Sequence, residues 1–380
     1  MTNIACQRHL FDMPREIAYL NCAYMSPLAH GVMEAMAKGV GRKAQPWSYT
    51  AAEFVSIPEE TRALFAGVFG SAADDIAIIP SVSYGLAVAA RNLPVAAGQS
   101  IIVLGDQFPS NLYVWREKAK AVGAAITTVW RDPDAAWTPA VLDAIGPDTA
   151  IVAVPNCHWA DGGLIDLVAV GAACRKFGAA LVLDLTQSLG AIPFDVGAVD
   201  PDFAVAACYK WLMGPYGIGA LCVAPRHQQG EPIEQTWMGR AGSEDFSRLV
   251  DYRDDYQPGA RRFDMGEKSN PALLLGASAA LRMLDAWDIA NIAETLTARS
   301  ERLAQKAAAL GFTALPVPAR AGHFLALGHK EGPPASLPER LAAEQVFVSL
   351  RGQSLRVTPH VYNDEEDCER LLQVLESVAA

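Results

Sequence analysis

The chain has 380 residues, a length that predicts two domains rather than a single core. Its formal net charge of −11 excludes broad contact with nucleic acid, and no apolar run approaches the ~20 residues that span a bilayer. The seven cysteines are scattered without a Cys-x-x-Cys pair, so we expect reduced thiols and no metal site. The N-terminal segment lacks the pattern of a secretion signal, and we therefore predict a cytoplasmic protein.

Short apolar runs rich in β-branched residues alternate with segments of helical period between about residues 75 and 225. Continuous apolar runs of this length are typical of strands buried on both faces of a sheet. Helices predicted at 110–121 and 166–177 supply crossovers, so the region predicts an α/β fold with a mainly parallel sheet flanked by helices. Its seven strands are expected at 75–79, 101–104, 125–129, 150–154, 180–183, 203–206 and 219–223.

The pattern changes after Gly259 to long helices at 271–287 and 289–309, followed by short strands around 323–327, 346–350 and 354–358. A last amphipathic helix is expected at 364–378, where acidic residues occupy the first turn, as the helix dipole favours. These elements predict a smaller α/β domain. We place the large domain at residues 21–270 and the small domain at residues 271–380 together with residues 1–20.

Lys210 lies in the segment ACYKWLMGPYGIG, between the end of a predicted strand and a loop rich in Gly and Pro. This position is at the carboxyl edge of a parallel sheet, where open α/β folds place their ligands. A lysine there can lose its proton through desolvation or a nearby cation, and the neutral amine then attacks an aldehyde to form an imine. The alternative is a surface lysine whose amine stays in water.

Asp184 follows an apolar run at the end of the preceding predicted strand. A carboxylate at that depth needs a cationic partner, and the protonated pyridine nitrogen of pyridoxal 5′-phosphate (PLP) is one such partner. Gln187, three residues later, could donate to the ring oxygen of the same cofactor. The alternative for Asp184 is a carboxylate that caps the next turn.

The segment PSVSYG at residues 80–85 joins the first predicted strand to a helix that runs to about Asn92. Hydroxyl groups and free backbone N–H groups converge there at a positive helix terminus, which suits a phosphate. The same residues also fit a simple N-cap motif.

These features follow one another in the order phosphate loop, ring acid and lysine, each at a strand end. Together they resemble the class V aminotransferase group of fold-type I PLP enzymes, which includes cysteine desulfurases, isopenicillin N epimerase-like proteins and kynureninases; the kynureninase pattern is the most similar. The resemblance spans nearly the whole chain, with LNCAY at 20–24, YKWL at 209–212 and LRVTPHVYN at 355–363. It implies PLP as the cofactor and a small amino acid as the substrate.

The resemblance also implies roles for Lys210, Asp184 and Gln187, which lie at or just after predicted strand ends. Lys210 would carry PLP as a Schiff base, Asp184 would pair with the pyridine nitrogen, and Gln187 would contact the phenolic oxygen. A histidine usually stands after the ring aspartate in kynureninases, at the position that Gln187 occupies here. That departure leaves hydrolysis of kynurenine as only one of the possible reactions.

Further cofactor contacts follow from the same resemblance. Ser83 and the backbone of Val82 are the expected phosphate ligands, together with Tyr209. Phe108 is the candidate for stacking on the cofactor ring, and a plain core phenylalanine is its alternative. Trp237 resembles a kynureninase tryptophan that reaches the phosphate from the neighbouring subunit, which implies a homodimer with shared active sites.

On the substrate side, the resemblance implies that Arg356 grips the α-carboxylate, because a guanidinium fork suits bidentate pairing. Asn156, which follows another predicted strand, could contact substrate or cofactor oxygen. His158 and Tyr24 are further pocket candidates, although a histidine in such a loop is often only packing.

The segment at 346–356, where cysteine desulfurases carry their nucleophilic cysteine, contains none here, and Cys368 falls on the closing helix. We therefore reject a persulfide relay. The leading interpretation is an aminotransferase-like enzyme, and the alternative is a PLP lyase, hydrolase or epimerase that uses the same carbanion.

A different class of function is a nucleotide-binding protein built on a doubly wound sheet. No Gly-x-Gly-x-x-Gly follows the first predicted strand and no Gly-x-x-x-x-Gly-Lys-Ser/Thr occurs, so the phosphate cradles of such proteins are missing. A catalytically silent protein with the PLP fold stays open as a further alternative.

Overall fold

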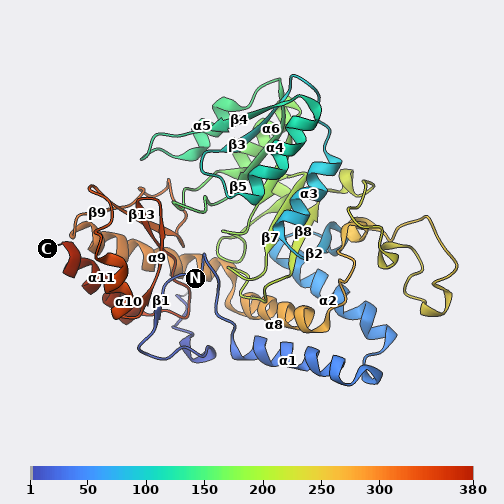
Figure 1. Cartoon of the computed structure of the whole chain (residues 1–380), viewed down its shortest axis with the longest axis horizontal. Coiled ribbons are helices and arrows are strands. Elements are labelled where there is room, and N and C mark those ends of the chain that lie inside the picture. Colours follow the sequence, from blue (N-terminus) through green and yellow to red (C-terminus); the bar gives the residue numbers. More distant parts are fainter. Residues whose placement is uncertain (1–2, 380) are drawn as a thin grey trace.

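The computed structural model describes residues 3–379 as an α/β protein with a large seven-stranded sheet and a smaller C-terminal domain (Figure 1). The predicted small domain also includes residues 1, 2 and 380, which lie outside the described residues. Within the described range, no helix is both long and apolar enough to cross a membrane.

The seven-stranded sheet confirms the predicted fold class. Its strand order is β2-β8-β7-β6-β5-β3-β4; β8 runs antiparallel to both of its neighbours, and the other pairs are parallel. The central strands are buried along their whole length, as expected for a sheet covered on both faces. The strands are β2 Ile76–Ile79, β3 Ser100–Leu104, β4 Ala125–Val129, β5 Thr149–Pro155, β6 Ala180–Asp184, β7 Phe203–Ala207 and β8 Gly219–Val223.

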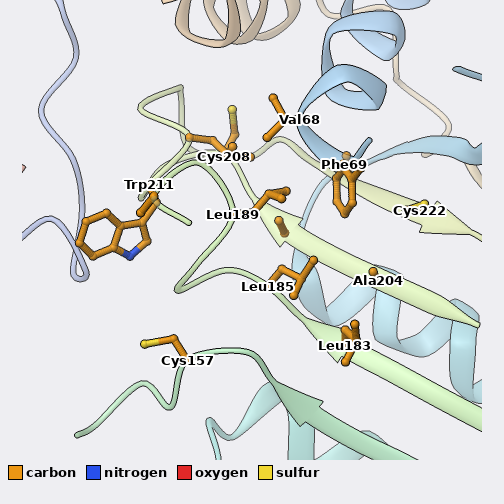
Figure 2. Close-up of a cluster of buried hydrophobic side chains, with 14 of the residues drawn as sticks. Val68, Phe69, Cys157, Leu183, Leu185, Leu189, Ala204, Cys208, Trp211 and Cys222 are labelled. Carbon is orange, nitrogen blue, oxygen red and sulfur yellow. The ribbon is translucent and has the colours of Figure 1, made fainter. Parts of the chain in front are cut away.

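Side chains alternate between the two faces of this sheet, and each face has its own hydrophobic core. One core joins strand residues to α3 and α4, and the other joins the alternate strand residues to α2, α6 and α8. Figure 2 shows part of the second core, which contains Phe69 of α2 and the strand residues Leu183, Ala204 and Cys222. The helices are α1 His30–Ala44, α2 Ala51–Phe69, α3 Val82–Asn92, α4 Ser110–Val122, α5 Trp137–Ala144, α6 Leu167–Phe177, α7 Val196–Val199 and α8 Pro271–Trp287.

The smaller domain is built on an antiparallel sheet with the order β12-β13-β10-β9. The segment predicted as one strand at 346–350 divides in two, because its first half pairs in parallel with β1 and its second half pairs with β13. A third hydrophobic core joins this sheet to α9 and α11. The elements are β1 Ala18–Tyr19, α9 Ile289–Ala308, β9 Phe312–Thr313, β10 Leu325–His329, α10 Leu337–Ala343, β11 Val346–Phe347, β12 Ser349–Arg351, β13 Ser354–Val357 and α11 Glu365–Ala379.

The segment between β8 and α8 contains only short 3-10 helices and extends away from the sheet, in yellow and gold at the right of Figure 1. Trp237, Val250 and Tyr252 in this segment are 43%, 74% and 91% exposed. Large apolar side chains that one segment exposes in this way suit contact with another protein chain.

Candidate active site

A cavity of about 190 Å³ lies at the carboxyl ends of β2, β5, β6 and β7. Open parallel α/β sheets bind ligands at this edge, because the loops that follow the strands and the helix N-termini beyond them converge there. The cavity is lined by seven of the eight residues predicted to bind the cofactor, namely Val82, Ser83, Phe108, Asp184, Gln187, Tyr209 and Lys210.

Lys210 lies in the tight loop between β7 and β8, and its side chain is only 7% exposed. Its Nζ is 5.4 Å from the ring centre of Phe108 and 5.5 Å from that of Tyr209, and it forms no ion pair with any described residue. Burial in these surroundings lowers the pKa of Lys210 to about 8, although the charge of Asp184 opposes the shift. A substantial fraction of the amine is therefore neutral near physiological pH.

Asp184 is the last residue of β6 and is 8% exposed. Burial raises the pKa of its carboxyl group, and the backbone N–H of Thr186 donates to Oδ1 at 3.0 Å. Within the described part of the chain, no lysine, arginine or histidine forms an ion pair with it. A buried carboxylate without a cationic partner is costly, so this position suits a ligand that brings a positive charge.

Gln187 is held in one orientation by its neighbours. The indole N–H of Trp211 donates to Oε1 at 2.9 Å, and Nε2 donates to the backbone oxygen of Ala23 at 3.1 Å. His323 Nε2 lies 2.6 Å from the backbone oxygen of Gln187. Because an amide carries two N–H groups, one donor of Gln187 remains for a ligand in the cavity.

The opposite end of the cavity is formed by the N-termini of α3 and α4. Ser81 caps α3, because its side chain accepts from the backbone N–H of Tyr84 at 3.2 Å. The N–H groups of Val82 and Ser83 lie in the first turn and therefore have no carbonyl partner within the helix. Ser83 Oγ donates to Ser110 Oγ, the first residue of α4, at 3.0 Å. Two positive helix ends and two hydroxyl groups converge here, an arrangement that suits a phosphate.

Arg356 reaches this region from β13 of the smaller domain, and it is 2% exposed. Its guanidinium donates to the backbone oxygen of Trp159 at 3.1 Å and to Ser349 Oγ at 3.5 Å, while Nε has no partner among the described residues. Burial lowers the pKa of Arg356 to about 10, because no carboxylate lies close enough to offset the desolvation. Trp159 lines the cavity, whereas Arg356 is not itself a lining residue and is connected to the cavity through Trp159.

The family model for class-V aminotransferases matches residues 19–371, nearly the whole chain. The chain belongs to the class-V aminotransferase family. It is therefore a PLP-dependent enzyme, as predicted, and the predicted family is confirmed.

Two relatives illustrate the range of this class-V family. An uncharacterized aminotransferase of Bacillus subtilis, YcbU, is 27% identical over 326 residues, which cover 83% of this chain and 82% of the relative. A kynureninase of Deinococcus radiodurans is 29% identical over 274 residues, which cover 69% of this chain and 64% of that enzyme. The two relatives differ in reaction type, so the family alone leaves the reaction of this chain open.

Solved structures resemble the whole fold. The protein C-DES, with glycine covalently linked to its PLP cofactor, matches with a TM-score of 0.87 at 19% identity and covers 98% of this chain and 99% of its own. A cysteine desulfurase from Thermococcus onnurineus matches with a TM-score of 0.82 at 20% identity and covers 100% of this chain and 99% of its own. These likenesses confirm the predicted fold-type I architecture.

The residues around the cavity fit the cofactor of this class-V enzyme. Asp184 offers a buried carboxylate to a pyridinium nitrogen, and Lys210 offers a largely desolvated amine to an aldehyde. The N-termini of α3 and α4 offer N–H groups and hydroxyls to a phosphate at the other end. Among the described residues, no group of three or more His, Cys, Asp or Glu side chains could hold a metal ion.

Two of the residues predicted to contact substrate or cofactor are engaged elsewhere and do not line the cavity. The amide of Asn156 donates to the backbone oxygen of Ile165 at 3.0 Å and faces a different hollow. His158 is buried, with Nδ1 3.0 Å from Asp161 Oδ1 and Nε2 3.2 Å from the backbone oxygen of Gly105. Both ring nitrogens are thus occupied, and the residue organises the loop after β5.

Tyr24 and Trp237 also lie outside the cavity of their own chain. Tyr24 is 55% exposed. Trp237 packs in the extended segment, where its ring centre is 6.2 Å from that of Phe54 and 5.5 Å from that of Phe246. Any contact of Trp237 with a cofactor would therefore have to be made in another copy of the chain.

The sequence-based site lacked several residues that line the cavity. Ser110 could have been found from its position directly after Phe-Pro at a predicted helix start, where its hydroxyl lies near a positive helix end. Thr186 follows the ring aspartate by two residues, and Cys157 follows β5. Tyr216, whose ring centre is 4.5 Å from that of Tyr209, had no local signal, because its place depends on how the lysine loop turns back.

Proposed function

We propose that this enzyme is an aminotransferase that acts on a small α-amino acid, with Lys210 as the residue that holds PLP covalently. The observation that carries the proposal is the buried amine of Lys210, with a pKa of about 8, between the Asp184 end and the phosphate end of one cavity. Bound PLP supplies an electron-poor ring that stabilises negative charge at the substrate Cα. Lys210 Nζ, once displaced by the substrate amine, is the base that moves the Cα proton.

The remaining contacts follow from the charge and hydrogen-bonding capacity of each side chain. Asp184 keeps the pyridine nitrogen protonated, because a buried carboxylate favours a proton on its partner. The free N–H of Gln187 is assigned to the phenolic oxygen. Phe108, whose ring lies near Lys210 Nζ, is assigned to the cofactor face.

The phosphate is assigned to the N-termini of α3 and α4. The backbone N–H groups of Val82 and Ser83 and the hydroxyls of Ser83 and Ser110, which lie together at the two helix ends, would hold it. Tyr209, which lines the same cavity, contributes its phenolic hydroxyl.

Arg356 is assigned to the α-carboxylate of the substrate, and another buried arginine of the same chain supports this. Arg62 is also fully buried, but it forms a bidentate pair with Asp264 at 2.9 and 2.7 Å. The carboxylates around Arg62 raise its pKa despite burial, whereas burial lowers the pKa of Arg356. A substrate carboxylate would give Arg356 the partner that the fold gives Arg62.

A lyase, hydrolase or epimerase is the second candidate, because these reactions use the same negative charge at Cα. The kynureninase relative and the C-DES structure, which is described as a cystine C-S lyase, support keeping it. A cysteine relay is not part of the proposal. Cys157 lines the cavity but is fully buried, and burial raises the pKa of its thiol; Cys368 is buried on α11.

We further propose a cytoplasmic homodimer with shared active sites. The exposed apolar side chains between β8 and α8 support a protein partner, and Trp237 would reach the phosphate of the second copy. The seven unpaired cysteines support a reducing compartment.

A single-turnover experiment separates the two candidate reactions. The PLP-loaded enzyme is mixed with each common amino acid, and the absorbance and the products are followed. Transamination predicts loss of the visible band, gain of a near-ultraviolet band and release of one keto acid per site. Return of the visible band with release of pyruvate, alanine or the opposite enantiomer would replace the aminotransferase by the second candidate.

A further inference from the structure

A second arginine lies beside Arg356 on the hairpin of the smaller domain. In the β12–β13 pair, Ser349 is opposite Arg356 and Arg351 is opposite Ser354. Because side chains alternate along a strand, Arg351 and Arg356 point to the same face of this sheet. Neither guanidinium forms an ion pair with a carboxylate of the described residues.

Trp159 connects both arginines to the cofactor cavity. Its backbone oxygen accepts from Arg356, and the guanidinium carbon of Arg351 lies 5.9 Å from its ring centre. Trp159 lines the cofactor cavity and also a second hollow, to which Arg351 contributes directly. Arg351 therefore lies where a substrate side chain would leave the cofactor and enter that hollow.

The charges in this second hollow do not satisfy Arg351. Arg131 and Asp161 form an ion pair with each other at 2.7 Å, which leaves no net charge from the two. Asp106 is exposed at the wall and makes no ion pair among the described residues. Arg351 itself donates only to the backbone oxygen of Leu350 at 2.8 Å. Burial is the main cause that lowers the pKa of Lys210, and the positive charges of Arg356 and Arg351 lower it further.

We propose that the substrate is an amino acid whose side chain carries a second acidic group, and that Arg351 binds this group while Arg356 binds the α-carboxylate. The inference rests on the proposed amino-acid chemistry and narrows its substrate class. A planar guanidinium pairs bidentately with a carboxylate or a sulfinate, and a neighbouring tryptophan face limits its motion. Arg351 is then the specificity-determining residue for an acidic side chain.

The test compares acids with their neutral amides in the PLP-loaded enzyme. Apparent dissociation constants are measured from the visible absorbance change with L-aspartate, L-asparagine, L-glutamate, L-glutamine and L-alanine. We expect at least one acid to bind more tightly than its amide by roughly 10- to 100-fold, the range for a hydrogen-bonded charge. Arg351→Gln should abolish that preference and leave the alanine and amide constants within about twofold.

Arg340→Gln is the matched control, because it removes the same charge from an exposed position on α10 of the smaller domain. It should leave the acid preference intact, and an unchanged visible band with an unchanged melting temperature verifies the fold of both variants. Equal binding of acids and amides by the unmodified enzyme would overturn the assignment of an acidic side chain to Arg351 and leave the proposed function intact. An acid preference that survives Arg351→Gln would do the same. No spectral response to any amino acid would overturn it together with the proposed function.

Discussion

The rate at which the apoprotein captures PLP should follow the titration of Lys210. With a pKa of about 8, about 24% of the amine is neutral at pH 7.5, whereas a lysine at the ordinary value of 10.5 would be about 0.1% neutral. The burial of Lys210 thus raises the reactive fraction roughly 200-fold at that pH. Because only the neutral amine attacks an aldehyde, the rate should rise with pH up to about 8 and then level off.

Growth of the visible band after mixing PLP with apoprotein gives this rate between pH 6.5 and 10. The rate per neutral amine of Nα-acetyl-lysine amide, calculated at each pH from its ordinary pKa, corrects for the titration of PLP itself, and Lys210→Ala should give no adduct that borohydride can trap. A corrected rate that keeps rising about tenfold per pH unit to pH 10 would refute the reasoning, because it would mean that Lys210 keeps the pKa of a solvated lysine.

Three further predictions concern the ends of the cavity. Arg356→Gln should weaken amino-acid binding in spectral titrations by about 2–5 kcal/mol without lowering the melting temperature. Arg62→Gln should instead lower the melting temperature, because buried Asp264 loses its bidentate partner and keeps only its ion pair with Lys268. The double variant Ser83→Ala with Ser110→Ala should weaken PLP retention in equilibrium dialysis by about 1.5–3 kcal/mol per lost hydrogen bond to the phosphate. Asp184→Asn should reduce turnover about 100-fold or more, and it should shift the midpoint of PLP capture to lower pH, because the charge of Asp184 supports the proton on Lys210. Unchanged amino-acid binding in Arg356→Gln would contradict its assignment, as would unchanged PLP retention in the double serine variant. An unchanged midpoint of PLP capture in Asp184→Asn would contradict the third assignment.

The large sheet could be predicted closely from the sequence, because its strands are buried on both faces and appear as uninterrupted apolar runs. Strands β4 and β8 begin and end where predicted, and each of the others differs by one residue at one or both ends. The antiparallel direction of β8 could not be predicted, because it depends on how the short lysine loop turns back. In the smaller domain, the change of partner within 346–350 is a tertiary effect that periodicity does not record.

The site residues that follow strands could also be predicted, because the carboxyl ends of parallel strands meet at one edge. Lys210 and Asp184 line one cavity for this reason. The position of Ser110 beside Ser83 requires α3 and α4 to converge, and no local pattern encodes that distance. Asn156 also follows a strand, yet its amide turns to Ile165 and away from the cavity. A strand end therefore locates a residue at the edge without fixing the direction of its side chain.

The two buried arginines differ in whether the fold neutralises their charge. Arg62 and Arg356 each lie beside apolar residues, and without the family resemblance the local sequence would not distinguish them. Arg62 meets Asp264 from a segment 202 residues away, so its charge is neutralised within the fold. Arg356 meets only an amide oxygen and a hydroxyl, so its burial costs free energy that the protein alone does not recover. We propose that a substrate carboxylate recovers that free energy on binding, so the missing partner, more than the residue type, supports Arg356 as a substrate-binding residue.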